Sequence, residues 1–217
     1  NWKDFSSVAK EFSVPGQNII YADTAGNIGW RAAALIPIRK EGGSLLPRPG
    51  WDPDYDWKGF IPFEEMPYLY NPNKGYIATA NNKIVDDTFP YYISNQWAEP
   101  SRIERIEEYI QSKEKLTVDD MKSLQNDMLS SFAREVTPNI LKHFPNNLKG
   151  NKKAAYNYLK NWDYIENHSS AATLVFHVIL DELLNNIYKD ELDLVHEKAF
   201  DALVHFSMLP YRNIHWV

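Results

Sequence analysis

Proline and glycine are distributed unevenly along this chain of 217 residues. Most residues of both types lie before Pro100, among many aromatic side chains and short apolar runs, whereas the later part has apolar residues at helical spacing. Proline fixes φ and lacks the backbone N–H, so it interrupts helices and inner strands. The sequence therefore predicts an α+β protein, with a strand and loop region over residues 1–100 and a helical domain over residues 101–217.

Two strands joined by a tight turn are predicted near the start of the chain. The β-forming runs at residues 19–21 and 28–30 flank Asp-Thr-Ala-Gly-Asn, an arrangement typical of a β-hairpin. Residues 32–38 are expected to continue the second strand, and residues 75–80 have the composition of a further buried strand. An amphipathic helix is predicted over residues 2–12, ahead of the hairpin.

Residues 41–73 predict a long irregular loop, because six prolines interrupt this segment. The loop is too aromatic for a disordered linker, and long ordered loops are usually functional or wrap a core. Its aromatic residues are Trp51, Tyr55, Trp57, Phe60, Phe63, Tyr68 and Tyr70.

A series of helices is predicted for the second region. Thr117 is suited to cap a helix, with Asp119 and Asp120 in the first turn, where the helix dipole favours negative charge. An apolar stripe is expected to form the core face of this helix, and it comprises Met121, Leu124, Met128 and Phe132. The other predicted helices span residues 102–111, 153–161, 171–188 and 193–208, with a loop over residues 145–150.

Composition excludes several classes of protein. The net charge is −6 and no basic block stands out, which argues against a nucleic-acid partner. The chain has no cysteine, so disulfide bonds and thiol catalysis are excluded. No apolar run approaches the roughly 20 residues that a membrane-spanning helix needs.

Four short motifs occur in order along the first region. They are Tyr-Ala-Asp-x-x-Gly-Asn-Ile-Gly at residues 21–29, Trp-x-Gly-x-Ile-Pro-Phe at 57–63, Asn-Pro-x-x-Gly-Tyr-Ile at 71–77 and Asn-Asn at 81–82. Together they resemble the penicillin acylase (penicillin amidase) family of N-terminal-nucleophile hydrolases, which cut amide bonds. The resemblance covers the first half of the chain well and the helical half only in general character.

The resemblance implies an enzyme whose core is a sandwich of two β-sheets between helix layers. Its nucleophile is a serine at the start of the mature large chain, upstream of these motifs, with its own α-amine as general base. We therefore expect this chain to be an internal segment of the large (β) chain, inactive alone. Its expected partners are the small chain, the serine-bearing start of the large chain and a small-molecule N-acyl substrate. The resemblance favours a periplasmic or extracellular location.

The resemblance places the side-chain amide of Asn81 in the oxyanion hole. Attack on an amide carbonyl puts negative charge on its oxygen, and a preorganised neutral donor stabilises that charge by ~3 kcal/mol. Two alternatives stay open at this point. Asn81 could satisfy backbone groups at the end of a strand, or the neighbouring Asn82 could be the donor.

Three further residues occupy positions that belong to the active site in the family. Arg102 corresponds to an arginine that supports the catalytic groups, with an exposed arginine in a first helical turn as the alternative. Gln17 and Asn18 correspond to the acyl-binding pocket, with hydrogen bonds to the backbone beside the hairpin as the alternative. Members that accept phenylacetyl groups have an apolar residue at the position of Gln17, so this polar residue argues against penicillin G as the best substrate.

No cofactor or metal site is predicted for this segment. Family members often bind a structural calcium ion, which we expect only in the intact enzyme because its carboxylates lie mainly upstream. Asp23 and Asn27 fit a turn held by side-chain hydrogen bonds better than a metal loop. His177 and Asp181 are four residues apart on a predicted helix but lack an obvious third ligand.

The sequence thus predicts part of a penicillin acylase-like amidohydrolase that works through an acyl-enzyme. A non-catalytic module that binds a peptide or an acyl chain on the same scaffold, through aromatic residues 51–70, is the alternative. The acyl group and the amine of the substrate are left open.

Overall fold

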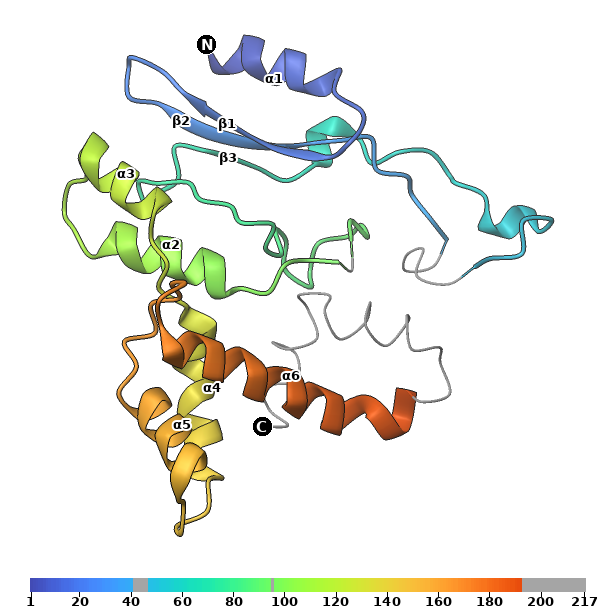
Figure 1. Cartoon of the computed structure of the whole chain (residues 1–217). Helices are drawn as coiled ribbons and strands as arrows, with labels where there is room; N and C mark the ends of the chain where they lie inside the picture. Colours follow the sequence, from blue (N-terminus) through green and yellow to red (C-terminus); the bar gives the residue numbers. More distant parts are fainter. Residues whose placement is uncertain (41–46, 95, 193–217) are drawn as a thin grey trace. The chain divides into compact units, whose positions relative to one another are not determined.

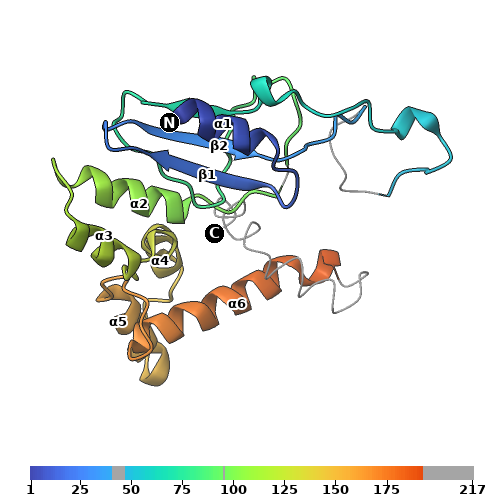
Figure 2. The same ribbon diagram turned by 90° about the horizontal axis from the view of Figure 1, so that it is seen from above.

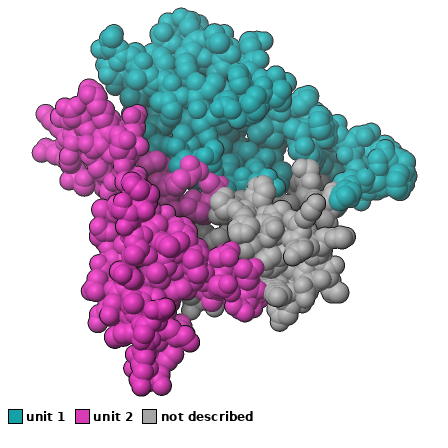
Figure 3. All heavy atoms as spheres, viewed as in Figure 1, with its two compact units in different colours: residues 1–97 teal, residues 98–217 magenta. Residues whose placement is uncertain are grey.

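The computed structural model describes residues 1–40, 47–94 and 96–192. The chain forms two compact units, residues 1–97 and residues 98–217, which Figure 3 colours separately. In the described residues, the first unit holds a small antiparallel sheet, one α-helix and two short 3₁₀ helices, and the second is helical, so the predicted α+β class is confirmed. No helix in the described ranges combines the length and the apolar character that crossing a bilayer requires.

The sheet of the first unit has three strands in the order β1-β2-β3. Strands β1 (Gln17–Ala22) and β2 (Ile28–Ala33) form the predicted hairpin, and β3 (Tyr68–Tyr70) pairs antiparallel with β2. Two short 3₁₀ helices, η1 (Pro53–Tyr55) and η2 (Phe63–Glu65), lie in the segment between β2 and β3. The hairpin prediction holds because its turn signal is local.

Helix α1 (Trp2–Lys10) lies along one face of this sheet, as Figures 1 and 2 show from two directions. Tyr21, Gly29 and Tyr70 stand opposite one another on the three strands. The Trp2 ring lies over this row, with ring centroids 5.6 Å from Tyr21 and 4.9 Å from Tyr70. A side chain at Gly29 would place its Cβ 2.3 Å from the Trp2 ring, so only glycine admits the indole here.

The opposite face of the sheet carries the apolar core of the first unit. Side chains alternate along a strand, so Trp30 points away from α1. It forms a buried cluster with Ala32, Ile61 and Met66. Residues after β3 close this cluster, and they include Ile77, Ile84, Tyr91 and Ile93.

Three sequence predictions for the first unit are wrong in detail. The second strand ends at Ala33 rather than continuing to residue 38. Residues 75–80 form no strand: Ala80 is buried and Ile77 packs on the core, but this segment pairs with no described strand. Strand β3 lies instead within the segment predicted as irregular. Apolar burial and strand pairing are separate requirements, and composition reports mainly the first.

The second unit contains five helices within the described residues. They are α2 (Ser101–Gln111), α3 (Val118–Gln125), α4 (Ser131–Lys142), α5 (Gly150–Lys160) and α6 (Ala171–Leu192). Their core consists of seven buried apolar residues, namely Ala133, Val136, Ile140, Leu159, Trp162, Ala172 and Phe176. Phe176 is fully buried and contacts the rings of Phe132 and Trp162.

The helix that Thr117 caps is shorter than predicted. Thr117 and Asp120 form a capping box at the start of α3, which confirms the predicted start. The helix ends at Gln125, however, and Phe132 belongs to the separate helix α4. Met121 and Met128 are therefore exposed rather than part of a core stripe. The helix predicted over residues 193–208 lies outside the described residues.

Candidate functional site

The hairpin turn is held by a network of side-chain hydrogen bonds centred on Asp23. Its Oδ1 accepts from the backbone N–H groups of Ala25 and Asn27, both at 2.9 Å. Its Oδ2 accepts from the Tyr21 hydroxyl at 2.7 Å and from Asn27 Nδ2 at 2.8 Å. These donors, the Tyr21 hydroxyl above all, lower the pKa of Asp23 to about 2. The carboxylate is thus used by the turn itself.

Asn71 connects the same turn to the third strand. Its Nδ2 donates to Asn27 Oδ1 at 2.9 Å, and its Oδ1 accepts from the Ile28 backbone N–H, also at 2.9 Å. Asn71 adopts a positive φ of 46°, which asparagine tolerates better than most residues. The turn therefore links residues more than 40 positions apart in the sequence, and the predicted turn held by side-chain hydrogen bonds of Asp23 and Asn27 is confirmed.

Asn81 and Asn82 differ in exposure and in backbone conformation. Asn82 Oδ1 accepts from the Ala80 backbone N–H at 3.1 Å, and its Nδ2 donates to the Lys83 carbonyl at 3.0 Å. Both ends of the Asn82 amide thus serve the local backbone. Asn81 is exposed and has a left-handed φ of 61°, which directs its side chain differently from that of a residue in a strand.

Gln17 and Asn18 begin β1 and point to opposite faces of the sheet, because neighbouring side chains on a strand alternate. Asn18 Oδ1 accepts from Trp30 Nε1 at 2.9 Å, on the face that carries the apolar core. Gln17 is exposed. A binding pocket on a single face of β1 would therefore be lined by one of these residues and not by both.

Arg31 lies on the α1 face of β2 among aromatic rings. Its guanidinium carbon is 4.4 Å from the Tyr68 ring centroid, 4.5 Å from that of Phe63 and 5.7 Å from that of Trp2. Nε and Nη1 are buried without a hydrogen-bond partner in the described part of the chain. Burial lowers the pKa of this guanidinium, and cation–π contacts take the place of a carboxylate.

Arg102 lies in the first turn of α2 and lines an open cavity of about 440 Å³ within the second unit. The cavity wall mixes charged and apolar side chains. It consists of Ser101, Arg102, Arg105, Ile106, Leu124, Asp127, Met128, Leu129, Ser130, Ser131 and Glu166. Arg102 is exposed at the surface of its unit.

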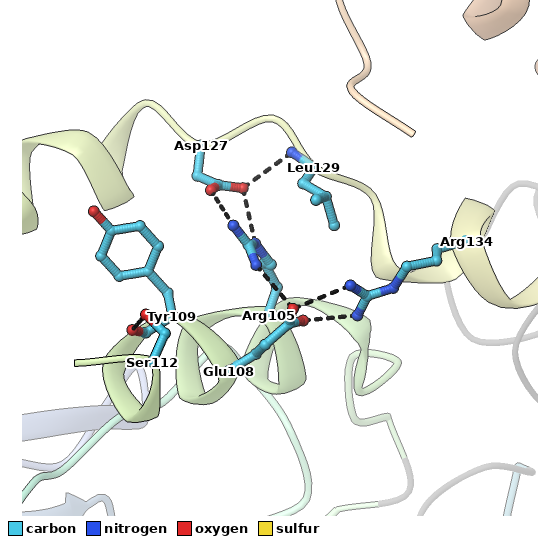
Figure 4. Close-up of polar contacts among 7 residues, drawn as sticks. All are labelled: Arg105, Glu108, Tyr109, Ser112, Asp127, Leu129 and Arg134. Carbon is cyan, nitrogen blue, oxygen red and sulfur yellow. Dashed lines mark hydrogen bonds and ion pairs between the residues drawn. The ribbon is translucent and has the colours of Figure 1, made fainter. Parts of the chain in front are cut away.

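A network of ion pairs surrounds Arg105, one turn further along α2 (Figure 4). Asp127 accepts from Arg105 Nε at 3.1 Å and from Nη2 at 2.6 Å. Glu108 lies 3.2 Å from Arg105 Nη1 and accepts two bonds from Arg134 of α4, at 3.1 and 2.7 Å. Arg105 lowers the pKa of Asp127, and Arg134 lowers that of Glu108.

His177 contacts Glu166 rather than a third ligand shared with Asp181. Its Nε2 lies 3.1 Å from Glu166 Oε2, a residue of the preceding loop. No group of three or more potential metal ligands occurs among the residues that the structure describes. The pair is therefore a surface contact between α6 and the loop before it.

The candidate residues fall in both units. Gln17, Asn18 and Asn81 belong to the first unit, and Arg102 belongs to the second. Sequence reasoning missed Arg105 and Asp127, which are 22 residues apart. The arginine and Glu108 are visible as an i, i+3 pair of opposite charge, but the distant aspartate carries no local signal.

Comparison with known proteins yields one family. The penicillin amidase family profile matches residues 1–216. The chain is similar to acyl-homoserine lactone acylase QuiP of Pseudomonas syringae pv. tomato, with 33% identity over 202 residues that cover 86% of this chain and 24% of that protein. It is also similar to penicillin acylase 2 proenzyme of Pseudomonas sp., with 39% identity over 113 residues that cover 52% of this chain and 15% of that protein.

A solved structure supports the same relationship. The fold is similar to that of the thermostable penicillin G acylase from Alcaligenes faecalis, with a TM-score of 0.70 and 26% sequence identity. The match covers 92% of this chain and 37% of the other. The chain spans about a quarter of the length of the acyl-homoserine lactone acylases that it matches.

Proposed function

Because this chain belongs to the penicillin amidase family, we propose that it is part of an amidohydrolase that cleaves N-acyl amide bonds through an acyl-enzyme. The proposed nucleophile is an N-terminal serine outside residues 1–217. Its hydroxyl attacks the amide carbonyl, the amine leaves, and water then releases the acyl group. The share of its relatives' length that the chain spans is consistent with a nucleophile located elsewhere.

Asn81 has the role of oxyanion-hole donor in this proposal. The single observation that supports it most is the place of Asn81 at the surface of its unit. Asn81 is exposed and has a left-handed φ of 61°, and the Asn82 amide bonds to the backbone of Ala80 and Lys83. An oxyanion donor must be accessible to a substrate oxygen.

We propose N-acyl-homoserine lactones as the substrate class, with the amide between the acyl chain and the lactone ring as the bond cleaved. In sequence, five relatives named for this activity match 86–97% of the chain and a sixth matches 58%, whereas the penicillin acylases match 52–55%. In structure, a penicillin G acylase matches 92% of the chain, so the proposal rests on the sequence matches. The polar Gln17 also disfavours a purely aromatic acyl group if it lines the pocket. Arg102 supports the catalytic groups from α2.

Replacing Asn81 in the full-length protein tests the proposal. We expect Asn81→Ala to lower kcat for homoserine lactone release about a hundredfold, because one oxyanion donor is lost. Alanine also strains a left-handed residue, so Asn81→Gly is the matched variant: glycine keeps this φ without strain. A similar loss in both variants assigns the effect to the amide.

The neighbouring residue provides the control. Asn82→Ala removes the acceptor of the Ala80 backbone N–H and should lower stability more than it lowers kcat. Near wild-type kcat in both Asn81 variants would contradict the assignment, and a hundredfold loss confined to Asn82→Ala would transfer the role to Asn82.

A binding module without catalysis is favoured by one observation. Trp51 and Trp57 are 88% and 61% exposed, which is unusual for such large rings. Acyl-homoserine lactone that binds to the full-length protein but is recovered intact after long incubation would support this second function.

A further inference from the structure

Helix α2 carries Arg102 but has little apolar anchorage of its own. None of its residues is fully buried, and its N-cap Pro100 makes no side-chain capping bond. Most helical stability in proteins comes from packing of an apolar face. The apolar side chains of α2 are only partly buried, so polar contacts also contribute to its orientation.

The Arg105–Asp127 pair is the best enclosed of these contacts. The side chains of Arg105 and Asp127 are 19% and 15% exposed, against 43% for both Arg134 and Glu108. The two bonds run in parallel from one guanidinium to one carboxylate, which defines the angle as well as the distance. Asp127 Oδ1 also accepts from the Leu129 backbone N–H at 3.0 Å, so the carboxylate itself is held.

Arg102 and Arg105 share one side of α2, because residues three apart are neighbours on a helix. Both line the same 440 Å³ cavity, and Asp127 lines it too. Rotation of α2 about its axis would move the two arginines together. A contact that fixes Arg105 therefore fixes the direction from which Arg102 leaves the helix.

We propose that Asp127 is a positioning residue for Arg102: through its two-bond pairing with Arg105 it sets the rotation of α2 and so the place of the Arg102 guanidinium. This inference rests on the catalytic support assigned to Arg102 in the proposed function. Asp127 itself touches no reacting atom in this scheme.

A double-mutant cycle on the full-length protein tests the positioning. Asp127→Asn keeps the size of the side chain but loses the ionic partner of Arg105. We expect it to lower kcat by about tenfold or more with little change in KM, since small misplacements of catalytic groups cost rate. In an Arg102→Ala background the same change should lower kcat by less than about twofold, because a positioning residue has nothing left to position.

Arg105→Lys gives a second route if Asp127→Asn fails to fold. Lysine keeps the charge but cannot make the two parallel bonds. We expect a smaller loss of kcat, again absent in the Arg102→Ala background. Asp119→Asn is the control, because this carboxylate is 87% exposed and its ion pair, among the residues that the structure describes, is with Lys122 on the same helix.

The outcomes separate the two hypotheses. The positioning role of Asp127 would be overturned if Asp127→Asn or Arg105→Lys lowered kcat by the same factor with and without Arg102→Ala. It would also be overturned if either change alone lowered Tm and left kcat unchanged. Wild-type kcat in Arg102→Ala would instead remove the catalytic role of Arg102, and the positioning proposal with it. If Asp119→Asn lowers kcat as much as Asp127→Asn does, the change in net charge explains the loss. That result would overturn the proposal.

Discussion

The two units of this chain stabilise themselves in different ways. The second unit encloses seven buried apolar residues between helices, with Phe176 fully buried at their centre. The first unit has a smaller apolar cluster, and it adds stacked rings around Arg31 and a polar network around Asp23. Close-packed apolar interiors respond mainly to lost volume, whereas stacked and hydrogen-bonded arrangements respond to geometry and charge. The difference teaches that the same kind of substitution should act differently in the two units.

The largest expected effect is in the second unit. Phe176→Ala should destabilise it by about 4 kcal/mol, because the change removes a buried ring and leaves a cavity. Amide hydrogen exchange of the full-length protein should show lost protection in α4, α5 and α6. Leu174→Ala, at a position 67% exposed on the same helix, is the control and should change protection by less than about 0.5 kcal/mol. Equal loss of protection throughout residues 1–97 would erase the contrast between the units.

A geometric change should dominate in the first unit. Gly29→Ala adds a single methyl group where the Trp2 ring already lies, so α1 must move away from the sheet. We expect a destabilisation of about 1–3 kcal/mol, typical of overpacking, with hydrogen exchange raised in α1 and in β1 to β3. The matched variant Gly50→Ala meets no atom within 4 Å and requires no unusual φ, so it should be nearly neutral. Full protection of α1 in Gly29→Ala would contradict the proposed contact.

The smallest effect concerns pH. The pKa of Asp23 is lowered to about 2, so the stability it contributes is present above about pH 4 and is lost as pH falls through 2. The Asp23 carboxylate raises the pKa of Tyr21 to about 12, so that contribution is present below pH 10 and is lost as pH rises through 12. Tyr21→Phe should therefore lower Tm by a constant amount between about pH 4 and 10.

Thermal unfolding of wild type and Tyr21→Phe across this range measures the difference. The difference in Tm should become smaller below about pH 4 and above about pH 10. It should shrink less on the acid side, because Asn27 still donates to Asp23 in the variant and keeps part of the lowered pKa of Asp23. A gap that stays constant to pH 12 would show that the hydroxyl contributes by packing alone.

The contrast between the units also explains what could be predicted from sequence. Helices α2, α5 and α6 and the Thr117 cap follow from spacing and capping residues, which are local. Asp23 and its turn were predictable for the same reason. Helix α4 was not predicted as a separate helix, because the apolar spacing continues from α3 to Phe132. Strand β3 was not predicted either, because it depends on pairing with β2 and not on its own three residues.

The candidate site divides along the same line. The motif at residues 81–82 located the two asparagines, but only the folded chain shows that Asn81 is exposed with a positive φ and that Asn82 bonds to Ala80 and Lys83. The pairing of Arg105 with Asp127 has no local signal in the sequence, since it joins α2 to the residues after α3. Contacts of this kind become visible only once the chain is folded.

The row of Tyr21, Gly29 and Tyr70 beneath Trp2 also bears on the order in which this unit folds. The two strands that carry Tyr21 and Gly29 are joined by a short turn and can meet within microseconds, as hairpins do. Tyr70 must close a far longer loop before it reaches β2, and loop closure slows folding. Trp2 can complete its set of ring contacts only when all three strands are in place. Although α1 is the first helix in the chain, its full set of ring contacts therefore forms only after the last strand of the sheet has paired.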